Sequence, residues 1–273
     1  MGENRKVVLV TGASSGIGRS CAKYLSKKGY TVFGTSRHFP PANLLETNGE
    51  FYTLRIDVTS DQSVNEAVQA ILSKTGGIDV LINNAGCALA GAIEDTSSEE
   101  ALSELNTNFL GAHRVTRAVL PSMRKRNSGY IVNISSLAGS IPLPFQAFYS
   151  ASKFALEALT EALRMEVKPF NIKVVSIQPN DYRTGLTDHR QKAAQWQESA
   201  YIERAEKALA VTEAGERNGP SPEEIAHLVE KIINKKSPKL RYQIGPNAKL
   251  IAFVRWLLPA RLSEWILMKY FRL

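Results

Sequence analysis

Residues 7–18 decide the fold, and they read VVLVTGASSGIG. The apolar run VVLV at the start of this stretch predicts a short buried strand. A turn with Gly12, Gly16 and Gly18 follows, and it leads into an amphipathic helix expected over residues 18–28. Glycines let the backbone approach a pyrophosphate closely, and the free N–H groups at a helix start favour an anion. The stretch therefore predicts a dinucleotide-binding turn at the beginning of an α/β fold.

The same alternation of short β-branched runs and longer amphipathic stretches continues along the chain. It predicts βαβ units, with a parallel sheet that is covered by helices on both faces. We expect a Rossmann-type doubly wound sheet of seven parallel strands, at residues 7–10, 31–35, 52–56, 80–83, 130–134, 174–178 and 240–244. The helices between them are expected at residues 18–28, 60–74, 98–125, 148–166 and 223–234.

We expect one domain over residues 1–273, because no Pro/Gly/Ser-rich linker divides the chain. Its core spans residues 5–245. A polar stretch at residues 180–220 interrupts the alternation, and a long insertion at the carboxyl end of a strand lies where ligands bind in such sheets. We interpret it as a substrate lid. Residues 246–273 form a C-terminal extension with an amphipathic helix near residues 261–272.

Composition excludes several classes of protein. With 44% hydrophobic and 22% charged residues, the chain is unlike disordered, collagen-like or coiled-coil proteins. The two cysteines, Cys21 and Cys87, are too few for a disulfide framework and have no metal-ligand spacing. We therefore expect no metal and a cytoplasmic location. No apolar run approaches the roughly 18 residues of a spanning helix.

The formal charge of +8 is unevenly distributed. Half of this excess lies in residues 246–273, and the other basic residues are scattered through amphipathic helices, so we expect no nucleic-acid binding. A basic amphipathic helix at the C-terminus could lie on a membrane surface as a peripheral contact. It could equally cover the mouth of the pocket or a seam between subunits of a homo-oligomer, and this packing is the interpretation we favour.

Arg37 marks the end of the second expected strand. An acidic residue about 20 positions beyond the glycine turn indicates NAD, whereas an arginine there indicates the 2′-phosphate of NADP. Arg37 follows Gly18 by nineteen positions, and the next carboxylate is Glu46. The guanidinium fork suits a phosphate. The sequence therefore predicts NADP as the cofactor.

Tyr149 and Lys153 are four residues apart on an expected helix, so they project from the same face. A phenol has a reference pKa of about 10 and needs help to exchange protons near neutral pH. An ammonium group one turn away would stabilise the phenolate. We expect Lys153, together with a cationic nicotinamide, to lower the pKa of Tyr149.

Together with the turn, residues 83–86 (NNAG) and the serines at 135 and 136 complete a pattern that resembles the classical short-chain dehydrogenase/reductase family. The resemblance covers residues 5–245. It implies a catalytic set of Asn108, Ser136, Tyr149 and Lys153, in which the spacing of thirteen to Tyr149 selects Ser136 over Ser135. The turn and the resemblance imply cofactor contacts from Gly12, Ser14, Ser15, Gly16, Ile17, Gly18, Arg37, Asp57, Asn84, Ala85, Gly86, Tyr149, Lys153, Pro179 and Thr184.

One position departs from the family pattern. The family has Pro-Gly after the sixth strand, whereas here Pro179 is followed by Asn180. Asparagine tolerates positive φ better than most residues. We therefore expect the turn to be kept, with the side chain close to the nicotinamide or the substrate.

The resemblance implies an NADP(H)-dependent oxidoreductase that interconverts a ketone or aldehyde and an alcohol by hydride transfer. Ser136 would stabilise the substrate oxygen, Tyr149 would transfer the proton, Lys153 would hold the nicotinamide ribose and Asn108 would position a water. Alternatives remain a reductase of a 3-oxoacyl or other small carbonyl compound, and a non-catalytic dinucleotide-binding redox sensor.

The substrate pocket is expected to be largely apolar. Ser136 and Tyr149 would contact the substrate oxygen, and Leu143, Phe145 and Tyr182 would form the apolar walls. Such a pocket favours a lipophilic substrate such as a steroid or a retinoid, and this part of the chain is similar to the hydroxysteroid and retinol dehydrogenase-type members of the family.

Overall fold

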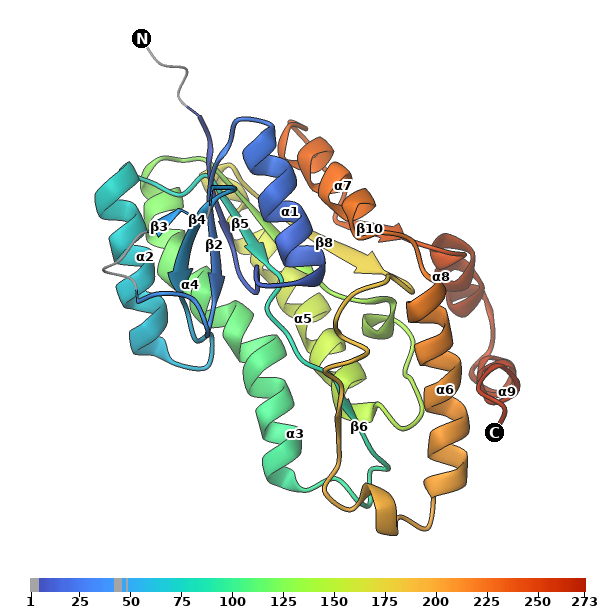
Figure 1. Cartoon of the computed structure of the whole chain (residues 1–273). Coiled ribbons are helices and arrows are strands. Elements are labelled where there is room, and N and C mark those ends of the chain that lie inside the picture. Colours follow the sequence, from blue (N-terminus) through green and yellow to red (C-terminus); the bar gives the residue numbers. More distant parts are fainter. Residues whose placement is uncertain (1–4, 42–45, 48) are drawn as a thin grey trace.

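The computed structural model describes residues 5–41, 46–47 and 49–273 (Figure 1). Its centre is a sheet in the order β10-β8-β7-β5-β1-β2-β4-β3, in which seven neighbouring strands are parallel and β3 (Glu46–Thr47) is antiparallel. The parallel strands are β1 (Val7–Val10), β2 (Thr31–Ser36), β4 (Tyr52–Arg55), β5 (Val80–Asn83), β7 (Gly129–Ile134), β8 (Ile172–Pro179) and β10 (Arg241–Ile244). The predicted seven-stranded doubly wound sheet is confirmed.

Helices cover both faces of this sheet, because its strands are apolar on both sides. Side chains of β1 alternate between two core clusters: Leu9 packs towards α2 and α4, and Val8 packs towards α1 and α7. Figure 1 shows these two layers on opposite sides of the strands. Helix α5 packs on the same face as α2 and α4 through Leu163. The bounds of these helices are α1 (Gly16–Lys27), α2 (Asp61–Thr75), α4 (Gly111–Lys125), α5 (Ala147–Glu166) and α7 (Glu223–Ile233).

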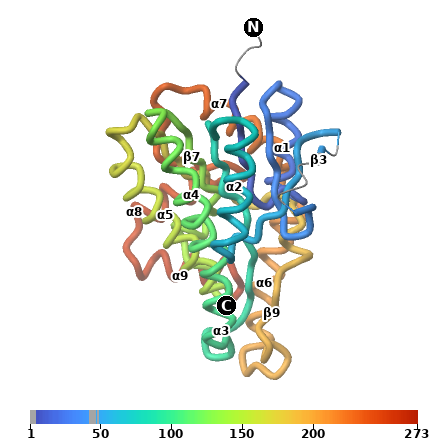
Figure 2. The backbone as a smooth tube through the Cα atoms, turned by 90° about the vertical axis from the view of Figure 1, so that its left-hand side faces the viewer, coloured from blue at the N-terminus to red at the C-terminus, as the bar shows by residue number. Residues whose placement is uncertain are grey.

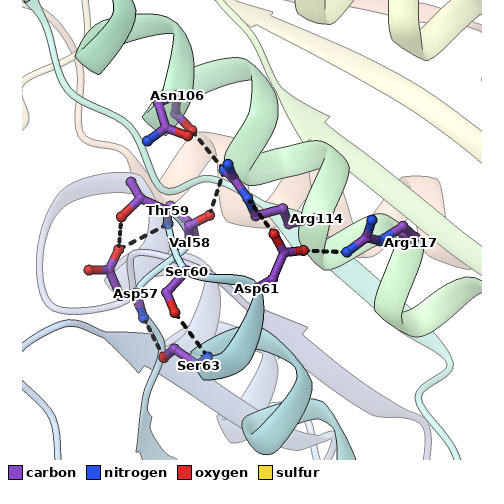
Figure 3. Close-up of polar contacts among 9 residues, drawn as sticks. All are labelled: Asp57, Val58, Thr59, Ser60, Asp61, Ser63, Asn106, Arg114 and Arg117. Carbon is purple, nitrogen blue, oxygen red and sulfur yellow. Dashed lines mark hydrogen bonds and ion pairs between the residues drawn. The ribbon is translucent and has the colours of Figure 1, made fainter. Parts of the chain in front are cut away.

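The single helix expected at residues 98–125 is interrupted. It consists of α3 (Ser98–Leu105), a π-helical turn at Asn106–Leu110, and α4. A π turn leaves backbone carbonyls without their regular partners. Here Arg114 Nη1 donates to the carbonyl of Asn106 at 3.3 Å (Figure 3). Helical periodicity in the sequence does not show such a turn, because the side chain that supports it, Arg114, takes its place only in the folded chain, where it also donates to the Val58 carbonyl.

The polar stretch at residues 180–220 lies below the carboxyl ends of the strands in Figure 1. Its helix is at the lower right of the view, and α3 is at the lower left. It contains β9 (Gln191–Lys192), which pairs with β6 (Leu89–Ala90), and a long helix, α6 (Ile202–Asn218), which we did not predict. The C-terminal extension forms two helices, α8 (Ala248–Leu257) and α9 (Ala260–Tyr270), in place of the one expected near residues 261–272. Figure 2 shows both away from α1 and α2.

Within the described ranges, none of the helices has the length and apolar character needed to cross a membrane.

Candidate active site

Tyr149 and Lys153 lie in the first half of α5, which is anchored firmly to the sheet. Glu157 Oε2 accepts a hydrogen bond from Arg241 Nε of β10 at 2.8 Å, and Thr160 Oγ1 accepts one from Asn133 of β7 at 2.8 Å. Both acceptors are buried. Because these bonds hold α5 against the sheet, the side chains of Tyr149 and Lys153 have a defined position.

Tyr149 is 9% exposed and interacts with Ser136, which follows β7. Burial raises the pKa of Tyr149 to about 12, and the hydrogen bond with Ser136 acts in the opposite direction. The expected lowering of this pKa is therefore not found in the protein alone, because desolvation of the phenolate is the largest effect and the carboxylates of Glu216 and Glu104 raise the pKa as well. At neutral pH the phenol keeps its proton.

Ser136 presents a hydroxyl group that can serve as a donor. Its Oγ accepts a hydrogen bond from the backbone N–H of Ala138 at 3.1 Å, so the hydroxyl hydrogen points elsewhere. Ser135 is buried, and its Oγ lies against Gly139. Of the two adjacent serines, only Ser136 interacts with Tyr149.

Lys153 is buried, with its Nζ 3.2 Å from the carbonyl oxygen of Ile134 and 5.7 Å from the ring centre of Tyr149. Burial lowers the pKa of its ammonium group, and Glu104 opposes this effect by raising it. An ammonium group in this position can donate to a second oxygen, such as a ribose hydroxyl, from its remaining hydrogens.

Asn108 lies in the π turn between α3 and α4 and is 2% exposed. Its Oδ1 accepts from the backbone N–H of Cys87 at 2.8 Å, and its Nδ2 lies 3.0 Å from the Cys87 carbonyl and 3.0 Å from Ser152 Oγ. These bonds join the segment after β5 to α5. Asn108 is thus fixed on the Lys153 side of the site.

Glu104 is a buried acid that the sequence analysis missed. Its Oε1 accepts from Asn108 Nδ2 at 2.8 Å, and its Oε2 accepts from the Cys87 thiol at 3.3 Å. Burial raises the pKa of Glu104 to about 7, against the lowering effects of Cys87, Lys153 and Asn108. The sequence could have indicated Glu104 through its position four residues before Asn108, because residues at this spacing lie on the same face of a helix.

The glycine turn has the shape of a phosphate cradle. Gly12 and Gly16 have φ values of 66° and 53°, and a Cβ on Gly18 would lie only 2.2 Å from the carbonyl oxygen of Gly12. Only glycine permits this combination of left-handed backbone and close approach. Ser14 and Ser15 are exposed beside it, and Ser15 makes no side-chain cap on α1. The N–H groups at the start of α1 are thus available to an anion.

The NNAG residues brace this turn from behind. Asn84 Nδ2 donates to the carbonyls of Thr11 at 2.9 Å and Gly12 at 3.1 Å, and the N–H of Ala85 donates to Thr11 Oγ1 at 3.0 Å. A Cβ on Gly86 would lie 3.0 Å from Asn108 Oδ1. The Asn84 side chain therefore supports the cradle by binding the carbonyls of Thr11 and Gly12. Ala85 and Gly86 connect the cradle to the region of Asn108.

Arg37 follows directly on β2 and is exposed. Its charge helps to hold the pKa of Asp57 below the ordinary value, although burial raises that pKa and hydrogen bonds from Thr59 are the larger lowering effects. Asp57 Oδ1 accepts from the N–H and hydroxyl of Thr59 at 2.9 and 2.7 Å (Figure 3). Arg37 and Asp57 therefore lie together at the carboxyl ends of β2 and β4.

A pocket of about 330 Å³ lies beside the start of α1. Its lining includes Arg19 and Arg183, which the sequence analysis did not select, and Thr184, whose Cβ would lie 3.2 Å from a Cβ on Gly16. In the sequence, these two arginines are marked only by their neighbours, because Arg19 follows Gly18 and Arg183 precedes Thr184. Ile17 packs partly against the core behind the turn, and Pro179 ends β8.

The residues proposed for the substrate pocket separate into three places. Leu143 packs with Ala88, Ala138 and Tyr149, and Leu186 of the lid joins them. Phe145 packs instead in a cluster with Trp196 and α6. These two leucines therefore form the apolar wall nearest to the phenol.

Tyr182 does not line the pocket, so this assignment is corrected. It is 4% exposed within the core between the sheet and α7, and its hydroxyl donates to Glu224 Oε2 at 3.0 Å. The reason is the turn after β8, which has its positive φ of 51° at Asp181 and directs Tyr182 inwards.

Asn180 also differs from the expectation. Its φ is not positive, since the left-handed residue is Asp181. Its side-chain Nδ2 donates to the carbonyl of Pro246 at 2.9 Å and to Asp181 Oδ2 at 3.0 Å. The amide therefore faces the beginning of the C-terminal extension.

A buried ion pair joins two parts of the polar stretch at residues 180–220. The Arg190 side chain is 3% exposed, and its Nη2 lies 2.6 Å from Glu216 Oε1 of α6. Thr187 Oγ1 donates to the other oxygen of Glu216 at 2.6 Å. The charges of Arg190 and Glu216 both affect the pKa of Tyr149, so this ion pair lies close to the candidate site.

No group of three or more His, Cys, Asp or Glu side chains that could hold a metal ion occurs within the ranges that the structure describes.

Comparisons with known proteins agree with this geometry. A sequence model of the short chain dehydrogenase family matches residues 6–195. A 3-ketodihydrosphingosine reductase from Bacteroides thetaiotaomicron is 44% identical over 247 residues, which cover 90% of each chain. The chain belongs to the short-chain dehydrogenase family, and it is an oxidoreductase of that family.

Solved structures extend the likeness to the fold. A short-chain dehydrogenase from Streptomyces avermitilis superimposes with a TM-score of 0.80 at 33% identity, over 97% of this chain and 98% of the other. The actinorhodin polyketide ketoreductase with NADPH gives a TM-score of 0.73 at 28% identity, over 91% and 99%. Further solved relatives hold NADP or NAD, so membership of the family leaves the cofactor to be argued from the site.

Proposed function

We propose that this protein is an NADP(H)-dependent reductase of a lipophilic ketone. The observation that carries the proposal is the position of Tyr149, a buried and protonated phenol beside the Ser136 hydroxyl, the Lys153 ammonium group and an apolar wall. A protonated acid next to a hydrogen-bond donor is what the reduction of a carbonyl group requires.

The residues present fit a bound NADPH. The cradle at Gly12, Gly16 and Gly18 would take the pyrophosphate, because added Cβ atoms would fill it. Arg37, at the carboxyl end of β2, would take the 2′-phosphate, and Lys153 would hold the nicotinamide ribose. When bound, NADPH supplies a hydride to the carbonyl carbon.

Residues of this chain bind and protonate the oxygen of the substrate. Ser136 Oγ donates a hydrogen bond to the carbonyl oxygen and stabilises the negative charge that develops there. Tyr149 Oη gives its proton to the same oxygen, which completes the alcohol and leaves a phenolate. Lys153 stabilises that phenolate, and Asn108 and Glu104 hold the surrounding polar groups in place on the side away from the substrate.

The substrate class follows from the pocket and the relative. Leu143 and Leu186 border Tyr149, so the side chains packed nearest to the phenol are apolar. The 44% identical relative is named for 3-ketodihydrosphingosine, a ketone on a long alkyl chain. We therefore favour a long-chain lipid ketone over a steroid or retinoid, and a 3-oxoacyl or small carbonyl compound stays as the second candidate.

Consumption of NADPH, followed as the loss of 340 nm absorbance, tests this proposal. The panel comprises 3-ketodihydrosphingosine, a steroid ketone, retinal, a 3-oxoacyl thioester and a short-chain ketone. We expect the highest kcat/KM with the long-chain ketone. Turnover of the short ketone alone would refute the lipophilic class, and absence of turnover with every compound would favour a dinucleotide-binding sensor.

A further inference from the structure

The C-terminal helices α8 and α9 carry the largest group of exposed apolar side chains among the described residues. Trp256 is 79% exposed, Trp265 is 58% exposed and Phe253 is 56% exposed. Six further exposed apolar side chains lie on the same two helices, namely Leu250, Leu257, Leu262, Ile266, Met268 and Tyr270. Nine exposed apolar side chains on two consecutive helices point to an interaction site.

Helix α8 is apolar on two faces. Ile251, Val254 and Leu258 are partly buried at a spacing of three and four residues, so they form the face towards the protein. Leu250, Phe253 and Leu257 repeat the same spacing one residue earlier, so they form an adjacent stripe about 100° around the helix, and this stripe is exposed. A helix on a water-covered surface keeps its outer face polar, so the outer face of α8 suits a non-aqueous neighbour.

Basic side chains border this apolar surface. Residues 246–273 contain five basic side chains and one acidic side chain, Glu264. Lys249, Arg261, Lys269 and Arg272 are all exposed. Positive charge beside exposed tryptophans matches an anionic lipid surface, where indole rings lie at headgroup level and cations approach the phosphates.

The two helices are short and firmly attached. With ten and eleven residues, each is about 15 Å long, which is half the thickness of the hydrocarbon core. Ala248 and Phe271 are buried at the two ends of the pair and hold it to the protein. This geometry suits helices that lie along a membrane surface.

We propose that α8 and α9 form a membrane-docking surface that binds an anionic lipid bilayer, with Phe253, Trp256 and Trp265 inserted among the headgroups. We prefer it to the packing interpretation of these helices, because basic side chains border the exposed apolar residues. The surface adjoins the turn after β8, because Asn180 donates to the Pro246 carbonyl, and burial together with the charge of Asp181 raises the pKa of Tyr270. For a lipid ketone, docking would bring the lid to the bilayer that holds the substrate, a consequence that rests on the proposed function.

Tryptophan fluorescence and vesicle flotation of the full chain test the surface without cofactor or ketone. The chain has three tryptophans, and the third, Trp196, is buried, so the variant Trp196→Phe reports on the two surface residues alone. The probes are vesicles of phosphatidylcholine and of an equal mixture of phosphatidylcholine and phosphatidylglycerol. We expect a blue shift and flotation with the mixed vesicles, and much weaker effects with phosphatidylcholine.

Substitutions separate the apolar and charged contributions. Trp256→Ser with Trp265→Ser is expected to weaken flotation about tenfold, whereas Met165→Ser, at an exposed apolar residue of α5, leaves it unchanged. Lys249→Glu with Lys269→Glu removes the preference for anionic vesicles.

Three results would overturn the proposal. The first is no flotation with either kind of vesicle, and the second is an equal loss of flotation in the Met165→Ser control. The third is a concentration-dependent dimer without lipid that the double tryptophan variant abolishes, which would assign the surface to a second copy of the chain. Vesicle binding combined with no reduction of any lipid ketone would support the surface and count only against the proposed substrate.

Discussion

Asn108 Nδ2 donates to Glu104 Oε1 at 2.8 Å, one helical turn away, and both side chains are 2% exposed. The catalytic asparagine implied by the family pattern is thus connected to a buried acid whose pKa burial raises to about 7. A group with this pKa changes its charge within the working range of most enzymes. Glu104 is therefore a positioning residue whose protonation state affects the Lys153 side of the site.

Glu104→Gln should remove a pH dependence of stability. The pKa of Glu104 is higher in the folded protein than its ordinary value of 4.5, so its contribution to stability is present below about pH 4.5 and is lost as the pH rises towards 7. We expect the difference in unfolding free energy between wild type and variant to fall by about 2 to 3 kcal/mol between pH 5 and pH 8.

Urea unfolding at the two pH values measures that difference. Glu100→Gln is the control, since Glu100 is a half-buried acid in the first turn of the same helix, and the hydrogen bond from the Ser97 backbone holds its pKa below the ordinary value. A difference between wild type and Glu104→Gln that stays constant across pH would mean that Glu104 does not titrate in this range.

Arg37→Asp should change the choice of cofactor. The arginine is exposed at the carboxyl end of β2, and loss of a charge-assisted bond to a phosphate costs about 1.5 to 3 kcal/mol. We expect the Kd for NADPH to rise about 10- to 100-fold, while NADH binding changes little. Fluorescence titration with both cofactors measures this, with Lys125→Asp at the far end of α4 as the matched charge reversal. Equal binding of NADPH and NADH by the wild type would contradict the assignment.

Arg190→Ala should loosen the lid. The pair of Arg190 with Glu216 is buried at 2.6 Å, and removal of one partner from such a pair leaves an uncompensated charge. We expect the KM for the ketone to rise about tenfold because the lid no longer excludes water well, with NADPH affinity unchanged. Arg217→Ala is the matched control, since Arg217 joins the same helix to Asp188 at 3.0 Å on the exposed surface. Equal KM values in the two variants would show that the buried ion pair does not contribute to lid closure.

The sheet could be predicted from the sequence because its strands are short β-branched runs with clear ends, and β1 and β5 have the predicted bounds. Helix α6 was missed although its residues are good helix formers, since we interpreted the polar stretch as an insertion that interrupts the alternation of strands and helices. The π turn that carries Asn108 could not be predicted, because Arg114 of the following helix supports it only in the folded chain, where it also donates to the distant Val58 carbonyl.

For the site, motif spacing brought together Ser136, Tyr149, Lys153 and Asn108 but could not find their supports. Glu104 and Arg190 are functional through burial and pairing, and both properties arise only in the folded chain. Tyr182 was misplaced for a similar reason, because a one-residue difference in the turn after β8 decides which side chain faces the core.

The most direct test of the central claim compares NADPH-dependent ketone reduction by the wild type and by Tyr149→Phe, with the cofactor Kd measured in parallel. We expect kcat to fall about 10²- to 10⁴-fold, which is the contribution of a positioned proton donor, and NADPH binding to stay intact. Tyr130→Phe, which removes the hydroxyl that donates to the Lys235 carbonyl at 2.8 Å, should keep its activity. A Tyr149→Phe protein that reduces the ketone at the wild-type rate would contradict the proposal that this phenol delivers the proton.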